Sequence, residues 1–129
     1  MDQVLLTIQV LCQEAICVEG QSRNIIMIPF TCTASGPYFN GQVIGPAVDT
    51  QKRHKDGSGT LSARYMLEGK DAQGRACRVF IENQGSKDTG FKPMVVTDSP
   101  LLAPWETADL YATVVGAPGG VTVTIYQRA

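Results

Sequence analysis

The chain has 129 residues, of which 43% are hydrophobic and 18% are charged, and its formal net charge at pH 7 is −1. These values predict one globular domain over residues 1–129, and they exclude an overall electrostatic field that would attract nucleic acid or an anionic membrane. Because the charged content lies below that of a typical soluble protein, we also expect a homo-oligomer, in which part of the surface is buried.

The N-terminal apolar run does not resemble a targeting segment. The run from Val4 to Leu11 has no preceding basic residue and is interrupted by Thr7 and Gln9, unlike a signal peptide. No stretch of the chain approaches the roughly 20 apolar residues of a membrane-spanning helix. We therefore expect a cytoplasmic protein with no membrane partner.

The cysteines are expected to be small buried side chains. Their spacing contains no Cys-x-x-Cys pair, and no histidine is placed to complete a zinc set. Two disulfides would suit a secreted protein, but disulfides are rare in the cytoplasm. This interpretation applies to Cys12, Cys17, Cys32 and Cys77.

Alternation of apolar and polar residues, which is typical of β-strands, runs through the first half of the chain. It predicts a first strand with Val4, Leu6, Ile8 and Val10 on one face, and a second strand over residues 23–33. A third strand is expected over residues 38–43. It bends at Gly45-Pro46 and resumes over residues 48–53.

Further strands are predicted over residues 60–68, 77–83, 92–97, 106–115 and 121–128, with a short helical turn ending near Leu102. No segment carries a helical stripe of three turns. About eight strands joined by short turns indicate an all-β fold, either a sandwich or an antiparallel barrel. We favour the barrel, similar to lipocalin-like barrels, because closure removes exposed strand edges.

Several short motifs follow one another in the central part of the chain: Gly41-Gln42-Val43, Asp49 and Gln51 after the bend, Ala63-Arg64-Tyr65 and Asn83-Gln84-Gly85. In this order, over about residues 38–127, they resemble the bacterial family catalogued as domain of unknown function 3237. Thr50 and Pro46 depart from that pattern, since Trp and Gly are common there. The resemblance implies a β-barrel similar to the allene oxide cyclase and dirigent barrels, and it implies no particular chemistry.

Charged and amide side chains inside predicted strands are candidate site residues, because such groups are costly to bury without partners. Asp49 and Arg64 lie on adjacent predicted strands and are expected to point into one lumen as an ion pair. Arg64 would stabilise developing negative charge, and Asp49 or Glu82 would move a proton. The alternative is a structural ion pair that closes one end of the barrel.

Gln51, Asn83 and Trp105 are candidate ligand contacts. Strand alternation lets at most one of Glu82 and Asn83 share a face with Arg64. Trp105, in a segment predicted to open a strand, would either cap the barrel mouth over an apolar ligand or plug the barrel end.

Other classes of site find little support in the sequence. The basic cluster Lys52-Arg53-His54-Lys55 precedes Asp56-Gly57, and we interpret it as a solvated hairpin rather than a phosphate or nucleic-acid contact. His54, the only histidine, falls at this tip, which disfavours a nucleophile–histidine arrangement. Phosphate-binding and dinucleotide-binding motifs are absent and the acidic residues are scattered, so we expect no cofactor and no metal.

These features together predict a barrel that binds a small apolar or aromatic carbonyl compound. It would catalyse cofactor-free proton transfer, as an isomerase or a cyclase does. One alternative is a non-catalytic small-molecule binding barrel. Another is a structural or accessory subunit of an oligomer, whose lumen would be filled by core side chains.

Overall fold

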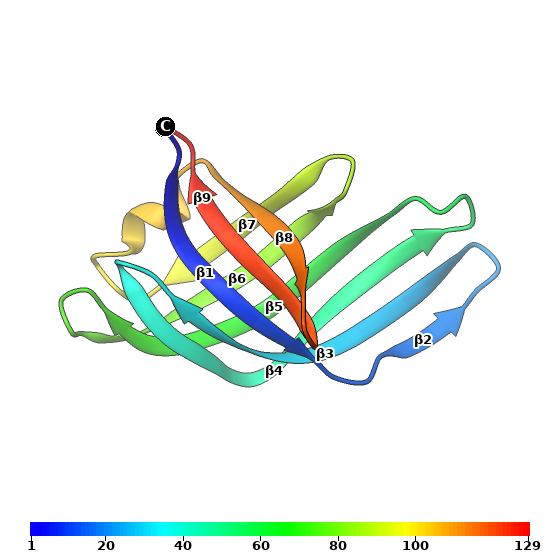
Figure 1. The fold of residues 1–129 in the computed structure, drawn as a ribbon, viewed down its shortest axis with the longest axis horizontal. Coiled ribbons are helices and arrows are strands. Elements are labelled where there is room, and N and C mark those ends of the chain that lie inside the picture. The colour runs from blue at the N-terminus through cyan, green and yellow to red at the C-terminus, as the bar shows by residue number, and fades with distance from the viewer.

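The chain forms a single antiparallel sheet that closes into an eight-stranded barrel, in a computed structural model that describes residues Met1 to Ala129. The strand order is β1-β9-β8-β7-β6-β5-β4-β3-β2, and the additional pairing of β1 with β3 closes the barrel (Figure 1). The predicted all-β barrel is therefore confirmed. The elements are β1 (Gln3–Cys12), β2 (Ile16–Glu19), β3 (Arg23–Ser35), β4 (Phe39–His54), β5 (Gly59–Asp71), β6 (Ala76–Ser86), β7 (Gly90–Thr97), η1 (Ala103–Glu106), β8 (Leu110–Ala117) and β9 (Gly120–Gln127).

Strand β2 lies outside the barrel. It pairs only with β3, and the β2–β3 hairpin projects away from the barrel beside the far ends of β4 and β5 (Figure 1). All four of its residues are exposed. The sequence did not predict this strand, because four residues are too few to show a clear period of two.

Strand β4 bends at Gly45-Pro46, as predicted. From Ile44 to Val48 the strand advances four residues, while its partners on β5 advance only two, from Met66 to Arg64. The two extra residues form a bulge, in which Gly45 adopts a φ of 67° that is accessible to glycine without steric cost. Because two residues are inserted, alternate side chains of β4 point to the same face of the sheet before and after the bend.

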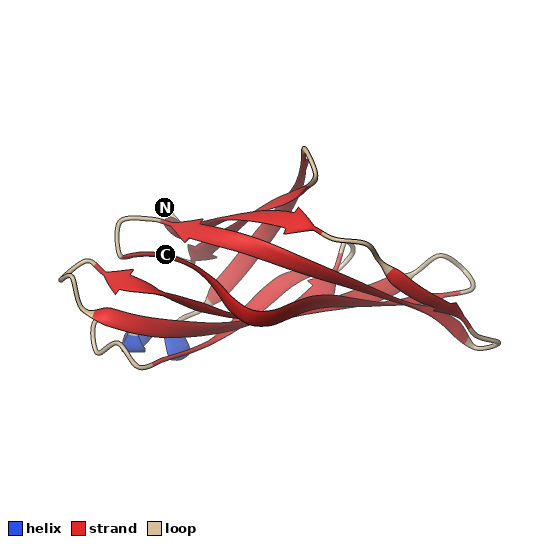
Figure 2. Cartoon of the chain, turned by 90° about the horizontal axis from the view of Figure 1, so that it is seen from below, coloured by secondary structure: helices blue, strands red, loops and turns tan.

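Apolar side chains plug the end of the barrel at which β4 begins. Phe39 and Leu67 are completely buried there. Trp105 of η1 packs edge to face against Tyr38, with 6.4 Å between the ring centroids. Figure 2 shows η1 as the only helical segment, set beside the strands. This end of the barrel therefore offers no entry to its interior.

Three expectations from the sequence were wrong in detail. The segment around Trp105 forms a 3-10 helix beginning with Ala103 and Pro104 instead of opening a strand, and β8 starts only at Leu110. A bulge between Val4 and Leu6 exposes Val4 and buries both leucines that follow it. Two of the cysteines, Cys12 and Cys17, are exposed, whereas Cys32 and Cys77 are buried as predicted.

No helix of the structure has the length and apolar character needed to cross a membrane.

Candidate functional site

On the interior wall of the barrel, Asp49 and Asn83 lie among mainly apolar side chains. Asp49 of β4 is paired with Ala63 of β5, which is paired with Asn83 of β6, so all three project from the same face of the sheet. That face is the interior one, because Tyr65, two residues beyond Ala63, belongs to the core and is 4% exposed. Asn83 is itself only 3% exposed.

A chain of hydrogen bonds connects Asp49 to the end of β4. Arg53 donates from Nη2 to Gln51 Oε1 over 2.8 Å, and Gln51 Nε2 donates to Asp49 Oδ2 over 3.0 Å. The three residues occupy alternate positions of one strand and therefore share its inner face. Arg53 is exposed while Asp49 is partly buried, so the chain leads from solvent into the barrel.

Two oxygens on this part of the inner wall have no hydrogen-bond partner. They are Asp49 Oδ1 and Asn83 Oδ1, and no other buried side-chain nitrogen or oxygen in the protein is unpartnered. Leaving a buried acceptor unpaired costs about 1–3 kcal/mol. Buried polar atoms are nearly always satisfied in native proteins, so two exceptions on one patch of the inner wall single it out as a site.

Burial also changes the acidity of this site. It raises the pKa of the Asp49 carboxyl above its usual value, and the hydrogen bond from Gln51 and the positive charge of Arg53 oppose that rise only in part. A raised pKa moves a carboxyl toward the range in which it can both take up and release a proton at neutral pH. Asp49 is therefore suited to act as a general acid or base.

A cavity of about 370 Å³ opens at the end of the barrel opposite η1. It lies between the β4–β5 and β6–β7 hairpins, which both extend to the side away from η1 in Figure 1. Apolar Leu61, Phe91 and Val114 line it together with Gln51 and Arg53. This size is near the lower end of the range for small-molecule sites, and the hydrogen-bonded chain runs from this cavity to Asp49.

The predicted pairing of Asp49 with Arg64 in one lumen is wrong. In the register of the two strands Arg64 lies opposite Val48, one residue before Asp49. A shift of one residue places a side chain on the other face of a sheet. Arg64 is exposed on the outer surface and forms no ion pair.

Glu82 and Asn83 separate as alternation requires. Glu82 lies opposite Arg64 on the outer face, where its carboxylate accepts a hydrogen bond of 3.1 Å from Ser62 Oγ. Asn83 lies on the inner face with Asp49. The structure thus brings together Asp49, Gln51 and Asn83, and it places Arg64 and Glu82 outside the barrel.

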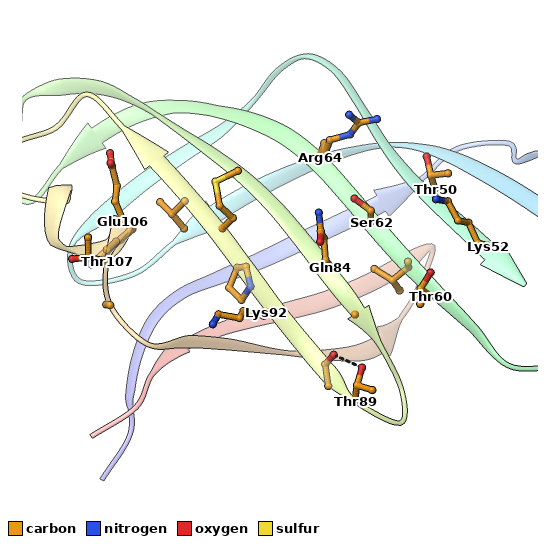
Figure 3. Close-up of a pocket in the computed structure, with 18 residues that line it drawn as sticks. Thr50, Lys52, Thr60, Ser62, Arg64, Gln84, Thr89, Lys92, Glu106 and Thr107 are labelled. Carbon is orange, nitrogen blue, oxygen red and sulfur yellow. Dashed lines mark hydrogen bonds between the residues drawn. The ribbon is translucent and has the colours of Figure 1, made fainter.

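An open groove of about 950 Å³ runs over the outer face of β4 to β7 (Figure 3). Its lining is mainly polar and includes Thr50, Lys52, Ser62, Arg64, Gln84 and Lys92. Although this groove is larger than the cavity at the mouth, none of its buried polar atoms lacks a partner. The interior is therefore the better candidate site.

Trp105 and Arg53 also occupy positions that bear on the sequence analysis. Trp105 was a candidate cap over a ligand at the mouth, but it is buried at the plugged end beside Tyr38, as its alternative role required. Arg53 was assigned to a solvated hairpin, yet it bonds Gln51 at the mouth. The signal for Arg53 was available, since Asp49, Gln51 and Arg53 repeat with the period of a strand.

The acidic, histidine and cysteine side chains do not converge on any point that could hold a metal ion. The polar groups of the inner site are instead the Asp49 carboxyl and the Gln51 and Asn83 amides, which suit hydrogen bonding and proton transfer to an organic ligand.

Comparison with known proteins identifies the fold but no activity. The family model described as "Protein of unknown function (DUF3237)" matches residues 3–97, so β1 to β7 lie within the match and β8 and β9 follow it. No curated protein matches the chain.

Several solved structures are similar to this barrel. A protein of unknown function from Clostridium acetobutylicum ATCC 824 is 22% identical, with a TM-score of 0.85 over 100% of this chain and 97% of that one. An enzyme from Penicillium herquei is 14% identical, with a TM-score of 0.79 over 98% and 92%. A β-barrel-like protein from Acinetobacter baumannii AYE is also 14% identical, with a TM-score of 0.72 over 98% and 96%. At these identities the likeness establishes the fold alone.

Proposed function

Since the chain belongs to the DUF3237 family of proteins of unknown function, we propose its function from the geometry of the site. The barrel binds a small, mainly apolar carbonyl compound through its open mouth, and Asp49 transfers a proton to or from this compound. The observation that carries this proposal is the unpartnered Asp49 Oδ1 inside the barrel. A buried carboxyl with a free oxygen and a raised pKa resembles a general base more than a structural group.

The proposed reaction is removal of a proton from the carbon next to a carbonyl group. Asp49 takes the proton, the electrons of the carbon–hydrogen bond form a carbon–carbon double bond, and the carbonyl oxygen becomes an enolate oxygen. The side-chain amide nitrogen of Asn83, which lies on the same inner face as Asp49, donates to that oxygen. Return of the proton to another carbon, or to the opposite face of the same carbon, yields an isomer and restores the Asp49 carboxylate.

The Gln51 amide and the Arg53 guanidinium support this role as positioning groups. Gln51 holds Asp49 Oδ2, which leaves Oδ1 directed to the ligand. Arg53 in turn fixes the orientation of the Gln51 amide by donating to its oxygen. Such support from neighbouring side chains is what keeps a catalytic group in a productive geometry.

Deuterium exchange tests the proposed reaction. Acetophenone carries an apolar ring, a carbonyl group and exchangeable methyl protons, and its exchange in deuterium oxide is followed by NMR. We expect the wild-type protein to accelerate exchange, and we expect Asp49→Asn to lose most of the acceleration, because positioned acid–base groups contribute about 10²–10⁴-fold.

The variant Arg64→Met serves as the matched control, since it removes a charge from the outer face of the neighbouring strand. If both variants exchange acetophenone at the wild-type rate, Asp49 is not the base. If acetophenone binds inside the barrel but no protein variant accelerates exchange, the protein is a binding barrel without proton-transfer activity.

A further inference from the structure

We infer that the inner site is complementary to a neutral hydroxyl group, so that the ligand it holds best is a phenol, an alcohol or the enol form of a carbonyl compound. This inference rests on the proposed function and names the chemical group that meets Asp49 and Asn83. It follows from counting the donors and acceptors at the inner wall and from the charge around them.

The first argument is the pair of free acceptors. Both unpartnered buried atoms are oxygens, and an oxygen acceptor is satisfied only by an O–H or N–H donor. A simple ketone or ether has no such donor and leaves both oxygens unpaired. A hydroxyl group supplies a donor to one of the two oxygens.

The second argument is the side-chain amide of Asn83. Its oxygen has no hydrogen-bond partner, although the residue is only 3% exposed. The amide oxygen accepts and the amide nitrogen donates, and a hydroxyl both donates and accepts. A hydroxyl group can therefore donate to the amide oxygen that the protein itself leaves unpaired.

The third argument is charge. Asp49 is the carboxyl group on this part of the inner wall, and the guanidinium of Arg53 is hydrogen-bonded to Gln51 at the exposed end of the chain. A ligand carboxylate beside the Asp49 carboxyl would bring no donor to the free oxygens, and the cations Arg53 and Lys87 line the cavity at its mouth. The site therefore disfavours anions and favours a neutral polar group.

The fourth argument is space. Ala63 lies between Asp49 and Asn83 in the register, and strands two apart in a sheet are separated by about 10 Å. Ala63 is a small residue that packs against the hydrophobic core, and it is the one residue of β5 that the register places between the two polar groups. Pro93, the buried partner of Asn83 on β7, adds an apolar surface on the far side.

The test compares three matched probes, which are phenol, anisole and benzoate. They share a ring and differ only in carrying a hydroxyl, a methyl ether or a carboxylate. Binding is measured by NMR from the shifts of the Asn83 side-chain amide and of the backbone amides of Ala63 and Asn83. We expect phenol to bind about tenfold or more tightly than anisole, because a hydrogen bond to a buried unpaired group is at stake, and we expect benzoate to bind weakest.

Two variants locate the preference. Asn83→Leu removes the amide but suits an apolar interior, and it should reduce the phenol-to-anisole ratio to near one. Gln84→Leu removes an amide from the adjacent exposed position on the outer face and should keep the wild-type ratio. Asp49→Asn, which preserves shape, gives a second reading if Asn83→Leu fails to fold, and it should also lower the ratio.

The outcomes separate this inference from the proposed function. Equal binding of phenol and anisole inside the barrel overturns the hydroxyl preference and leaves the binding function standing. Tightest binding of benzoate overturns the charge argument and therefore the inference. If no probe shifts the resonances of Ala63 and Asn83, both the inference and the proposed binding function fail.

Discussion

Asp71 and Asp49 are both aspartates on the interior side of the barrel, yet their surroundings are opposite. Asp71, at the plugged end, accepts hydrogen bonds from Ser99 Oγ at 2.8 Å and from the backbone N–H groups of Gln73 and Arg75 at 3.0 and 3.1 Å. Asp49, toward the open end, accepts one bond from Gln51 and has an unpartnered oxygen.

The pKa values follow this difference. The hydrogen bond from the Ser99 hydroxyl, supported by those from the backbone of Arg75 and Gln73, holds the pKa of Asp71 below its usual value. Burial with few compensating bonds raises the pKa of Asp49. The same residue type therefore serves structure at one end of the barrel and is available for chemistry at the other. The difference lies in the number of donors that the fold supplies.

The largest effect on stability is expected from removing a donor to Asp71. Ser99 is 1% exposed, so Ser99→Ala leaves a carboxylate oxygen without its partner and should lower the free energy of unfolding by about 1–3 kcal/mol. Urea denaturation followed by circular dichroism measures the change. Ser62→Ala, which removes a hydroxyl donor to Glu82 on the outer face, is the control and should change it by less than about 0.5 kcal/mol. Equal losses in the two variants would contradict the structural role of the Asp71 cluster.

The variant Asp49→Asn should be as stable as the wild type or up to about 1 kcal/mol more stable at neutral pH, because functional groups held in unfavourable surroundings cost stability. The neutral amide keeps the shape and can still accept the bond from Gln51. A loss comparable to that of Ser99→Ala would show that Asp49 is a structural residue and would remove the contrast with Asp71.

The pH dependence of stability should have opposite signs for the two aspartates. Asp71 has a lowered pKa in the folded state, so its contribution is present above the unfolded value of about 3.8 and is lost as the pH falls below it. Asp49 has a raised pKa, so its contribution is complete below about 3.8 and is lost as the pH rises through the folded pKa.

Melting temperatures of the wild type, Asp49→Asn and Asp71→Asn between pH 3 and pH 7 test these signs. The melting temperature of Asp49→Asn should rise relative to that of the wild type as the pH increases. The melting temperature of Asp71→Asn should lie below that of the wild type at neutral pH and approach it at acidic pH. Parallel curves for all three proteins would mean that neither carboxyl titrates differently in the folded and unfolded states.

The smallest effect is expected for Arg64→Met. Its guanidinium is exposed and unpaired, so the free energy of unfolding should change by less than about 0.5 kcal/mol. If Arg64 formed the structural ion pair with Asp49 that the sequence allowed, removing the guanidinium would lower the free energy of unfolding by about 3–5 kcal/mol. A loss of that size would therefore contradict the strand register itself.

Much of the fold could be predicted from the sequence, because alternation and turn residues are local signals. The strands around Ile8, Phe30, Leu67 and Ile81 each bury alternate apolar residues, and the bend at Gly45-Pro46 is marked by the two residues that interrupt a strand. The misses were β2, which is too short to show a period, and η1, whose Trp105 lies next to Pro104 in a run that lacks any alternation.

The candidate site was predictable only in part. Asp49, Gln51 and Asn83 were recognised as polar residues within strands, and that recognition needed only their positions in the sequence. Their grouping required the register of β4 on β5 and of β5 on β6. Arg64 fell on the opposite face from Asp49 because Val48, one residue earlier, is its partner.

The amino-acid sequence by itself determined the strands, the antiparallel barrel and the set of polar residues that could form a site, because these depend on neighbours along the chain. The tertiary structure decided which polar residues meet, which end of the barrel is open and which oxygens stay unpaired. Those properties depend on contacts between segments far apart in sequence, where a shift of one residue in register exchanges the inner face for the outer one.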